Sequence, residues 1–202
     1  MKKLLELIGN EFCDSDGWFR IVSADWTADE LRLDVSVCLC EEKEIQLWEI
    51  SCESVFEEKL SSDYSEILTL GSDHSLLLKF KEPEVDVAFS RNSMSSDELF
   101  GIVATCCFKY LGEQPLTNWI NQQASSQGIC SSKYGILGRF PVTVANEIVR
   151  QLEAKEISVN LLEPRSPKYW DGAQHCEYPE NIEVLIIGDS YVVGTNFSAM
   201  RA

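Results

Sequence analysis

Apolar and polar residues alternate most regularly in the first fifth of the chain. Between residues 31 and 39, every second position is leucine or valine, and the positions between them are polar or cysteine. This period of two predicts a β-strand that buries one face in a core, as is typical of an antiparallel sheet. Further alternating or apolar segments predict strands at residues 18–25, 48–52, 67–70, 76–80 and 85–89. Residues 18–90 therefore resemble a meander of about five or six strands.

Helical spacing of apolar residues marks the segments on either side of this meander. Before it, four apolar residues share one face of a predicted helix: Leu4, Leu5, Ile8 and Phe12. After it, Ser95 and Glu98 form a capping box that begins a helix, and Gly112 ends that helix. A short helix is predicted from Pro115. A longer one from Pro141 has five apolar residues on its core face: Val144, Ala145, Ile148, Val149 and Leu152.

The last third of the chain returns to strands. Residues 124–138 are rich in serine, glutamine and glycine and predict a loop. Residues 157–161 alternate as a strand, and residues 163–181 form a polar connection with three prolines. Two final strands flank the triplet Gly188-Asp189-Ser190, which predicts a hairpin.

The order of these elements predicts the fold class. Strands and helices are segregated along the chain, which favours an α+β fold with an antiparallel sheet over a doubly wound parallel sheet. The helices follow the meander, and the predicted hairpin comes last. If the last strands return to the first sheet, residues 1–202 form a single domain. The alternative is a division into a β-rich acidic part, residues 1–92, and a mixed helix and strand part, residues 93–202.

The acidic residues of the chain are concentrated in its first half. The net charge is −16, and residues 1–100 hold 23 acidic and 9 basic residues, against 10 and 8 in residues 101–202. Such a field repels nucleic acid and anionic membranes and favours a basic protein partner. Six glutamates are the candidate binding residues: Glu41, Glu42, Glu44, Glu53, Glu57 and Glu58.

Apolar run lengths and cysteines indicate the compartment. No segment reaches the roughly 18–20 apolar residues that span a bilayer, and the N-terminal segment is broken by Glu6, Asn10 and Glu11 before a signal-peptide core could form. We therefore expect a cytoplasmic protein that is not inserted in a membrane. Its eight cysteines are then expected to be reduced, and most of them to be buried as small apolar residues.

One short motif has the form of a catalytic block. The strand from Val184 leads into Gly188-Asp189-Ser190, and this segment resembles the first block of the SGNH family of esterases and lipases. The resemblance covers about eight residues and implies that Ser190 is a nucleophile. A serine nucleophile needs a base within hydrogen-bond reach, and the chain offers His74 or His175. The alternative interpretation is a tight turn between two strands.

The remaining chemistry-bearing residues do not match a known metal or cofactor pattern. The cysteines and histidines show no Cys-x-x-Cys or His-x-x-x-His spacing, and no glycine-rich phosphate loop follows a strand. We expect no metal and no cofactor. The sequence favours a non-catalytic protein that binds a basic protein partner through acidic residues, as toxin-neutralising immunity proteins do. A small hydrolase using Ser190 is the second interpretation, and an assembly subunit is the third. The oligomeric state stays open.

Overall fold

The chain forms two compact units, each with its own core. The computed structural model describes residues 1–27, 30–40, 44–90, 93–112, 114–121 and 133–202. Unit 1 comprises Met1–Leu77 and Pro179–Ala202, and unit 2 comprises Leu78–Tyr178, so unit 2 is inserted into the sequence of unit 1. The boundary considered from the sequence, between residues 92 and 93, falls inside unit 2. The single-domain assignment stays a prediction, because compactness alone does not measure independent folding.

Unit 1 is built on a six-stranded antiparallel sheet, which confirms the predicted α+β class. The strand order is β1-β2-β3-β11-β10-β4. The two last strands form the predicted hairpin and return to the first sheet between β3 and β4. The elements of unit 1 are α1 (Lys2–Glu11), β1 (Trp18–Thr27), β2 (Glu30–Cys38), β3 (Gln46–Lys59), β4 (Leu68–Gly71), the 3-10 helix η1 (Ser75–Leu77), β10 (Glu183–Ile187) and β11 (Ser190–Arg201).

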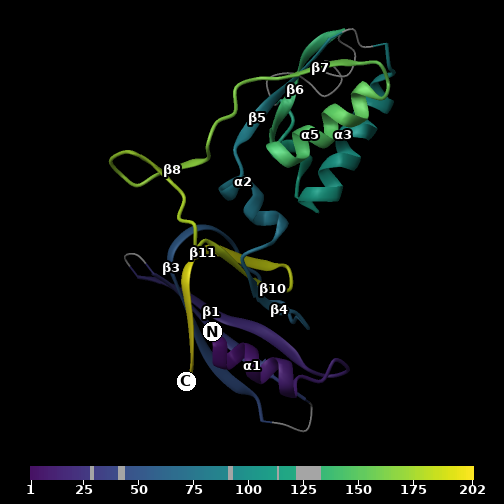
Figure 1. Cartoon of the computed structure of the whole chain (residues 1–202). Coiled ribbons are helices and arrows are strands. Elements are labelled where there is room, and N and C mark those ends of the chain that lie inside the picture. The colour runs from purple at the N-terminus through teal and green to yellow at the C-terminus, as the bar shows by residue number, and fades with distance from the viewer. Residues whose placement is uncertain (28–29, 41–43, 91–92, 113, 122–132) are drawn as a thin grey trace. The chain divides into compact units, whose positions relative to one another are not determined.

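The core of unit 1 lies between one face of this sheet and α1. The alternating apolar residues of β2 point into it, and Leu33 lies opposite Ile50 of β3. Helix α1 lies along the strands (Figure 1) and contributes Leu4, which is fully buried. Because only one face of β1, β2 and the first half of β3 is covered in this way, the other face carries the polar residues of the alternation.

Unit 2 packs two helices against a smaller antiparallel sheet. Its strand order is β6-β5-β7, and a separate two-stranded hairpin, β8-β9, lies within the same unit. Helices α3 and α5 pack together and share a core cluster with the sheet (Figure 1). The elements of unit 2 are α2 (Leu78–Lys81), β5 (Glu84–Ser90), α3 (Ser96–Leu111), the 3-10 helix η2 (Leu116–Asn118), β6 (Tyr134–Pro141), α5 (Val142–Glu153), β7 (Ser158–Leu161), β8 (Lys168–Trp170) and β9 (His175–Glu177).

The helix signals of the sequence are confirmed in unit 2. The Ser95 hydroxyl accepts a hydrogen bond from the Glu98 main-chain N–H at 3.3 Å, and Gly112 ends α3 with a φ of +61°. Pro141 precedes the first residue of α5. Four of the five residues predicted on the core face of α5 are buried, and the fifth, Val149, is partly exposed: the buried four are Val144, Ala145, Ile148 and Leu152.

Three local predictions are wrong. Residues 75–81 are helical, although a strand was predicted at 76–80. The prediction failed because the run Leu76-Leu77-Leu78 is continuously apolar, and periodicity does not distinguish a helix from a strand in such a run. The predicted loop ends in strand β6, which pairs with β5. Gly138 serves close packing, because a Cβ there would clash with the carbonyl oxygen of Trp119. The polar connection at 163–181 contains β8 and β9.

The meander is correct for β1, β2 and β3 only. These three strands follow one another in the sheet, but β4 lies beyond the C-terminal hairpin and β5 belongs to the sheet of unit 2. Strand order depends on long-range pairing, and the local alternation of residues does not encode it.

Candidate functional site

The outer face of the unit 1 sheet carries acidic side chains on three adjacent strands. Because side chains alternate between the faces of a strand and directly opposed residues share a face, the register places these acids together. Between β2 and β3, Glu30 lies opposite Glu53 and Asp34 lies opposite Glu49. Between β1 and β2, Asp25 lies opposite Arg32. We call the five carboxylate residues the acidic ladder: Asp25, Glu30, Asp34, Glu49 and Glu53.

The ladder faces away from the core of unit 1. The residues that alternate with it on β2, Leu31, Leu33 and Val35, are at most 2 % exposed and belong to the core cluster. The ladder residues themselves are partly or fully exposed. The sheet therefore presents its carboxylates to solvent, where a partner can reach them.

Polar contacts fix several of these carboxylates in place. Arg32 donates two hydrogen bonds to one carboxylate oxygen of Glu30, at 3.0 and 2.8 Å. This contact is the main reason that the pKa of Glu30 lies below its usual value. The Ser23 hydroxyl donates to Asp34 at 2.6 Å, and the Asn196 side-chain amide donates to Glu53 at 2.9 Å. Three of the five ladder carboxylates, those of Glu30, Asp34 and Glu53, are thus held in place by other side chains before any partner binds.

The glutamates predicted from the sequence fall in different places. Glu53 is on the ladder, and Glu44 is exposed in the connection before β3. Glu57 accepts a hydrogen bond from the Tyr191 hydroxyl at 2.7 Å. Glu58 is exposed and, as the next residue on the same strand, points to the opposite face from Glu57.

Two predicted residues, Glu41 and Glu42, lie outside the described part of the chain. Four ladder residues were not predicted from the sequence, although their signal was present. Glu30 and Asp34 occupy polar positions of β2, within the clearest alternation of the chain, and this alternation already marked one face of the strand as polar. The sequence does not give the register between β1, β2 and β3, which places these side chains on one face. The four ladder residues that were not predicted are Asp25, Glu30, Asp34 and Glu49.

Exposed apolar side chains lie beside the ladder on the same face. Met200 of β11 is opposite Glu49 of β3 and is 60 % exposed. Leu47, two residues before Glu49 on β3, is 42 % exposed. Residues two apart on a strand share a face, so Leu47, Glu49 and Met200 form one surface that combines apolar contact area with negative charge.

Ser190 is held inside the hairpin and engaged by the main chain. It is 3 % exposed. Its hydroxyl donates to the Ser61 carbonyl oxygen at 3.2 Å and accepts from the Ser61 N–H at 2.8 Å. Gly188, with a φ of +58°, is the first central residue of the two-residue turn, which is where a type II′ turn takes glycine. These contacts favour the turn interpretation, and the esterase interpretation stays a prediction.

The two histidines have local partners in different units. His74 is in unit 1, where its Nδ1 accepts a hydrogen bond from the Leu76 N–H at 3.2 Å. His175 is in unit 2, on β9, where its ring lies 5.2 Å from the ring of Trp170. Neither contact involves Ser190.

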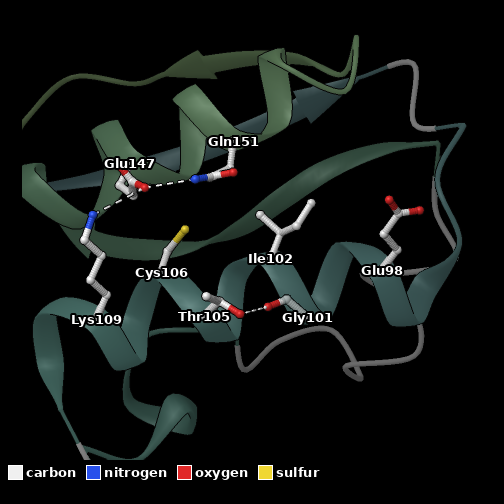
Figure 2. Close-up of a pocket in the computed structure, with 8 residues that line it drawn as sticks. All are labelled: Glu98, Gly101, Ile102, Thr105, Cys106, Lys109, Glu147 and Gln151. Carbon is white, nitrogen blue, oxygen red and sulfur yellow. Dashed lines mark hydrogen bonds and ion pairs between the residues drawn. The ribbon is translucent and has the colours of Figure 1, made fainter.

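A pocket of about 390 Å³ lies between α3 and α5 in unit 2 (Figure 2). Lys109 of α3 and Glu147 of α5 form an ion pair across it at 3.6 Å. The side chain of Arg150, bonded to Glu147 at 2.6 Å, is the main cause that lowers the pKa of Glu147 to about 2. Burial raises the pKa of the Cys106 thiol, which is therefore protonated at neutral pH and a weak nucleophile. Lys109 and Glu147 of this pocket are thus paired with each other, and Glu147 is also paired with Arg150.

No model of a protein family, no curated protein and no solved structure matches the chain significantly. In the described ranges of the chain, every helix is too short or too polar to cross a membrane.

Proposed function

We propose that this protein binds a basic protein partner through the acidic ladder of unit 1 and neutralises it, as immunity proteins neutralise toxins. The observation that carries the proposal is the register, which places five carboxylates on one exposed face of three strands. In this proposal the protein acts in the cytoplasm and performs no catalytic step.

The arrangement of the ladder favours a cationic partner energetically. Like charges directly opposite each other on adjacent strands destabilise a sheet. The ladder holds two such pairs, Glu30 with Glu53 and Asp34 with Glu49. Arg32, which lies between Glu30 and Asp34 on β2, already offsets part of this repulsion in the free protein. A lysine or arginine of a partner relieves more of it, which stabilises the bound state.

Charge and shape indicate a protein as the ligand. Unit 1 holds 21 acidic and 7 basic residues, and its field accelerates the approach of a basic protein. Small molecules bind in concave pockets, whereas the ladder lies on the open face of a sheet. Leu47 and Met200 supply apolar contact area beside the charges, as protein interfaces require.

The test is affinity capture from the native cell with the tagged full-length protein, followed by washes of increasing salt. We expect a basic protein in stoichiometric amount that is released as salt rises. The double variant Glu49→Lys, Glu53→Lys should lose this partner. The matched control, Glu153→Lys with Glu163→Lys, makes the same change in net charge at exposed positions of unit 2 and should retain it.

A second measurement separates neutralisation from mere binding. The activity of the captured partner is assayed with and without an equal amount of this protein, and we expect inhibition by the wild type and by the unit 2 control only. If the ladder variant binds and inhibits as well as the wild type, the ladder is not the binding face. If no basic partner is retained at low salt, the proposed function is wrong.

A further inference from the structure

Two cysteines and an aspartate from separate segments meet at one end of unit 1. Cys13 and Asp16 follow α1, and Cys40 follows β2. The two thiol sulfurs and a carboxylate oxygen of Asp16 all lie within 4.8 Å of one another, and each of the three residues is partly exposed. We call these three residues the thiol–carboxylate cluster.

Main-chain hydrogen bonds hold the cluster together. The Asp16 and Gly17 N–H groups both donate to the Cys13 carbonyl oxygen, at 3.3 and 2.8 Å, and this turn presents Cys13 and Asp16 on one side. The Cys13 N–H donates to the Leu39 carbonyl oxygen at 2.8 Å, which places Cys13 beside Cys40. The position of each ligand atom therefore depends on backbone contacts that the fold already makes.

Packing around the turn leaves it little freedom. A Cβ at Gly17 would lie 2.5 Å from the ring of Phe12 and 2.9 Å from the Cys13 carbonyl oxygen, so only glycine fits there. The Phe12 ring itself stacks on Phe19 of β1 with 4.9 Å between ring centroids. A turn that is fixed in this way holds the backbone of Cys13 and Asp16 in place, which lowers the cost of ordering the ligands on binding.

We propose that the thiol–carboxylate cluster binds a thiophilic divalent cation, with zinc as the best fit. Zinc takes cysteine sulfur and carboxylate oxygen in tetrahedral sites, and its bonds of about 2.3 Å to sulfur place neighbouring sulfurs about 3.8 Å apart. Distances of up to 4.8 Å need a closing movement of about 1 Å, which side-chain rotation supplies. Cys13, Cys40 and Asp16 provide three ligands, and water completes the fourth position.

The charge balance of the site favours a cation. Binding replaces the two thiol protons by one zinc ion, so two protons leave when both cysteines become thiolates. The three ligands then carry three negative charges around two positive ones. Unit 1 has 14 more acidic than basic residues, and its field concentrates cations near such a site. This inference concerns residues that the proposed partner-binding face does not use.

A second thiol and carboxylate pair in the chain provides the matched control. In unit 2, the Cys176 sulfur donates to a carboxylate oxygen of Asp171 at 3.1 Å. Cys176 is partly exposed, as Cys13 and Cys40 are. This pair has one thiol where the cluster has two, so it shares the local chemistry and lacks the third ligand.

The experiment measures zinc binding by the full-length protein, reduced with a phosphine and freed of metal with a chelator. Titration against a chromophoric zinc chelator should give one tight site per chain, and zinc should raise the melting temperature. Cobalt as a probe should give the charge-transfer absorption of thiolate–metal bonds in the near ultraviolet. Cys13→Ser and Cys40→Ser should each weaken zinc binding by more than about tenfold, the smallest loss seen even for outer-shell partners.

The controls decide between this cluster and the other thiols. Cys176→Ser should bind zinc as the wild type does. If a cysteine variant fails to fold by circular dichroism, Asp16→Asn and Asp16→Cys carry the test: the first should weaken zinc binding, and the second should retain or strengthen it. The proposal is overturned if the reduced wild type binds no zinc, or if binding persists in all folded variants of Cys13, Asp16 and Cys40.

Discussion

The two units are equal in length but differ sharply in charge. Unit 1 holds 21 acidic and 7 basic residues, whereas unit 2 holds 12 and 10. Each unit has its own cluster of buried apolar residues, so the difference does not arise from a missing core. Unit 2 has a core of the same kind with nearly balanced charge. The excess of acidic residues in unit 1 has no counterpart in unit 2, and it is the property on which the proposed binding role depends.

The units also differ in how they accommodate their carboxylates. In unit 2, Arg139 donates two hydrogen bonds to Asp86, at 3.0 and 3.1 Å, and Glu147 is bonded to Arg150. In unit 1, Glu30 is paired with Arg32, but its cross-strand neighbour is another acid, Glu53. Unit 2 uses charge to join its own elements, whereas unit 1 presents like charges side by side on an open face.

The largest effect should come from removing a core aromatic residue from one unit at a time. Phe140 in unit 2 and Phe19 in unit 1 are both fully buried. Because each lies in the core cluster of its own unit, Phe140→Ala and Phe19→Ala should each cost about 3–5 kcal/mol of the stability of that unit. Native-state hydrogen exchange should show the loss of protection in unit 2 for the first variant and in unit 1 for the second.

These two variants control for each other. If either one lowers protection equally across both units, the units unfold as one cooperative body and the comparison between them fails. In that case the prediction of a single domain over residues 1–202 gains direct support.

A smaller effect, of about 1–3 kcal/mol, should follow Ser190→Ala. The Ser190 hydroxyl both donates to and accepts from the main chain of Ser61, and its removal leaves those groups without this partner. Urea denaturation should show a lower free energy of unfolding for unit 1. Ser198→Ala is the matched control on the same strand, because its hydroxyl contacts Ser51 at an exposed position and should cost little. A variant that loses an ester hydrolysis activity at unchanged stability would instead favour a nucleophile.

The sequence predicted those parts of the fold that depend on local periodicity. Strand β2, the cap of α3, the start of α5 and the C-terminal hairpin each follow from residues within one segment. The strand at β6 was missed because Gly135 and Gly138 indicate a loop when seen locally. In the fold, Gly138 allows the backbone to approach Trp119. Close packing between distant segments leaves no local pattern that could be recognised.

For the candidate sites too, local sequence patterns predicted some residues, whereas contacts between distant segments determined the others. Glu53 was found from charge alone, but its ladder partners required the register between strands. The thiol–carboxylate cluster could not be found by ligand spacing, because Cys40 is 24 residues from Asp16 along the chain. They are brought together by the main-chain hydrogen bond from Cys13 to Leu39 and by the Cys40 thiol, which donates to a carboxylate oxygen of Asp16 at 3.7 Å. Such a contact follows from the packing of α1 on the sheet, which no short motif encodes.

The smallest effect should be an acid-dependent loss of stability confined to unit 2. Contact with Arg150, and then with Gln151, lowers the pKa of Glu147 to about 2, from 4.5 in its ordinary state. A carboxylate whose folded pKa is depressed stabilises the fold above its unfolded pKa. This contribution is therefore complete above pH 4.5 and falls as the pH approaches 2.

The variant Glu147→Gln should remove that pH dependence, while Glu153→Gln, an exposed change on the same helix, should keep it. The measurement is the free energy of unfolding of unit 2, followed by hydrogen exchange, at several pH values between 5 and 2. Unit 1 serves as an internal reference, because Glu147 belongs to the other unit. If Glu147→Gln changes the acid response of unit 1 as much as that of unit 2, carboxylate pairing does not distinguish the two units. The contrast in how they use charge would then rest on the acidic ladder alone.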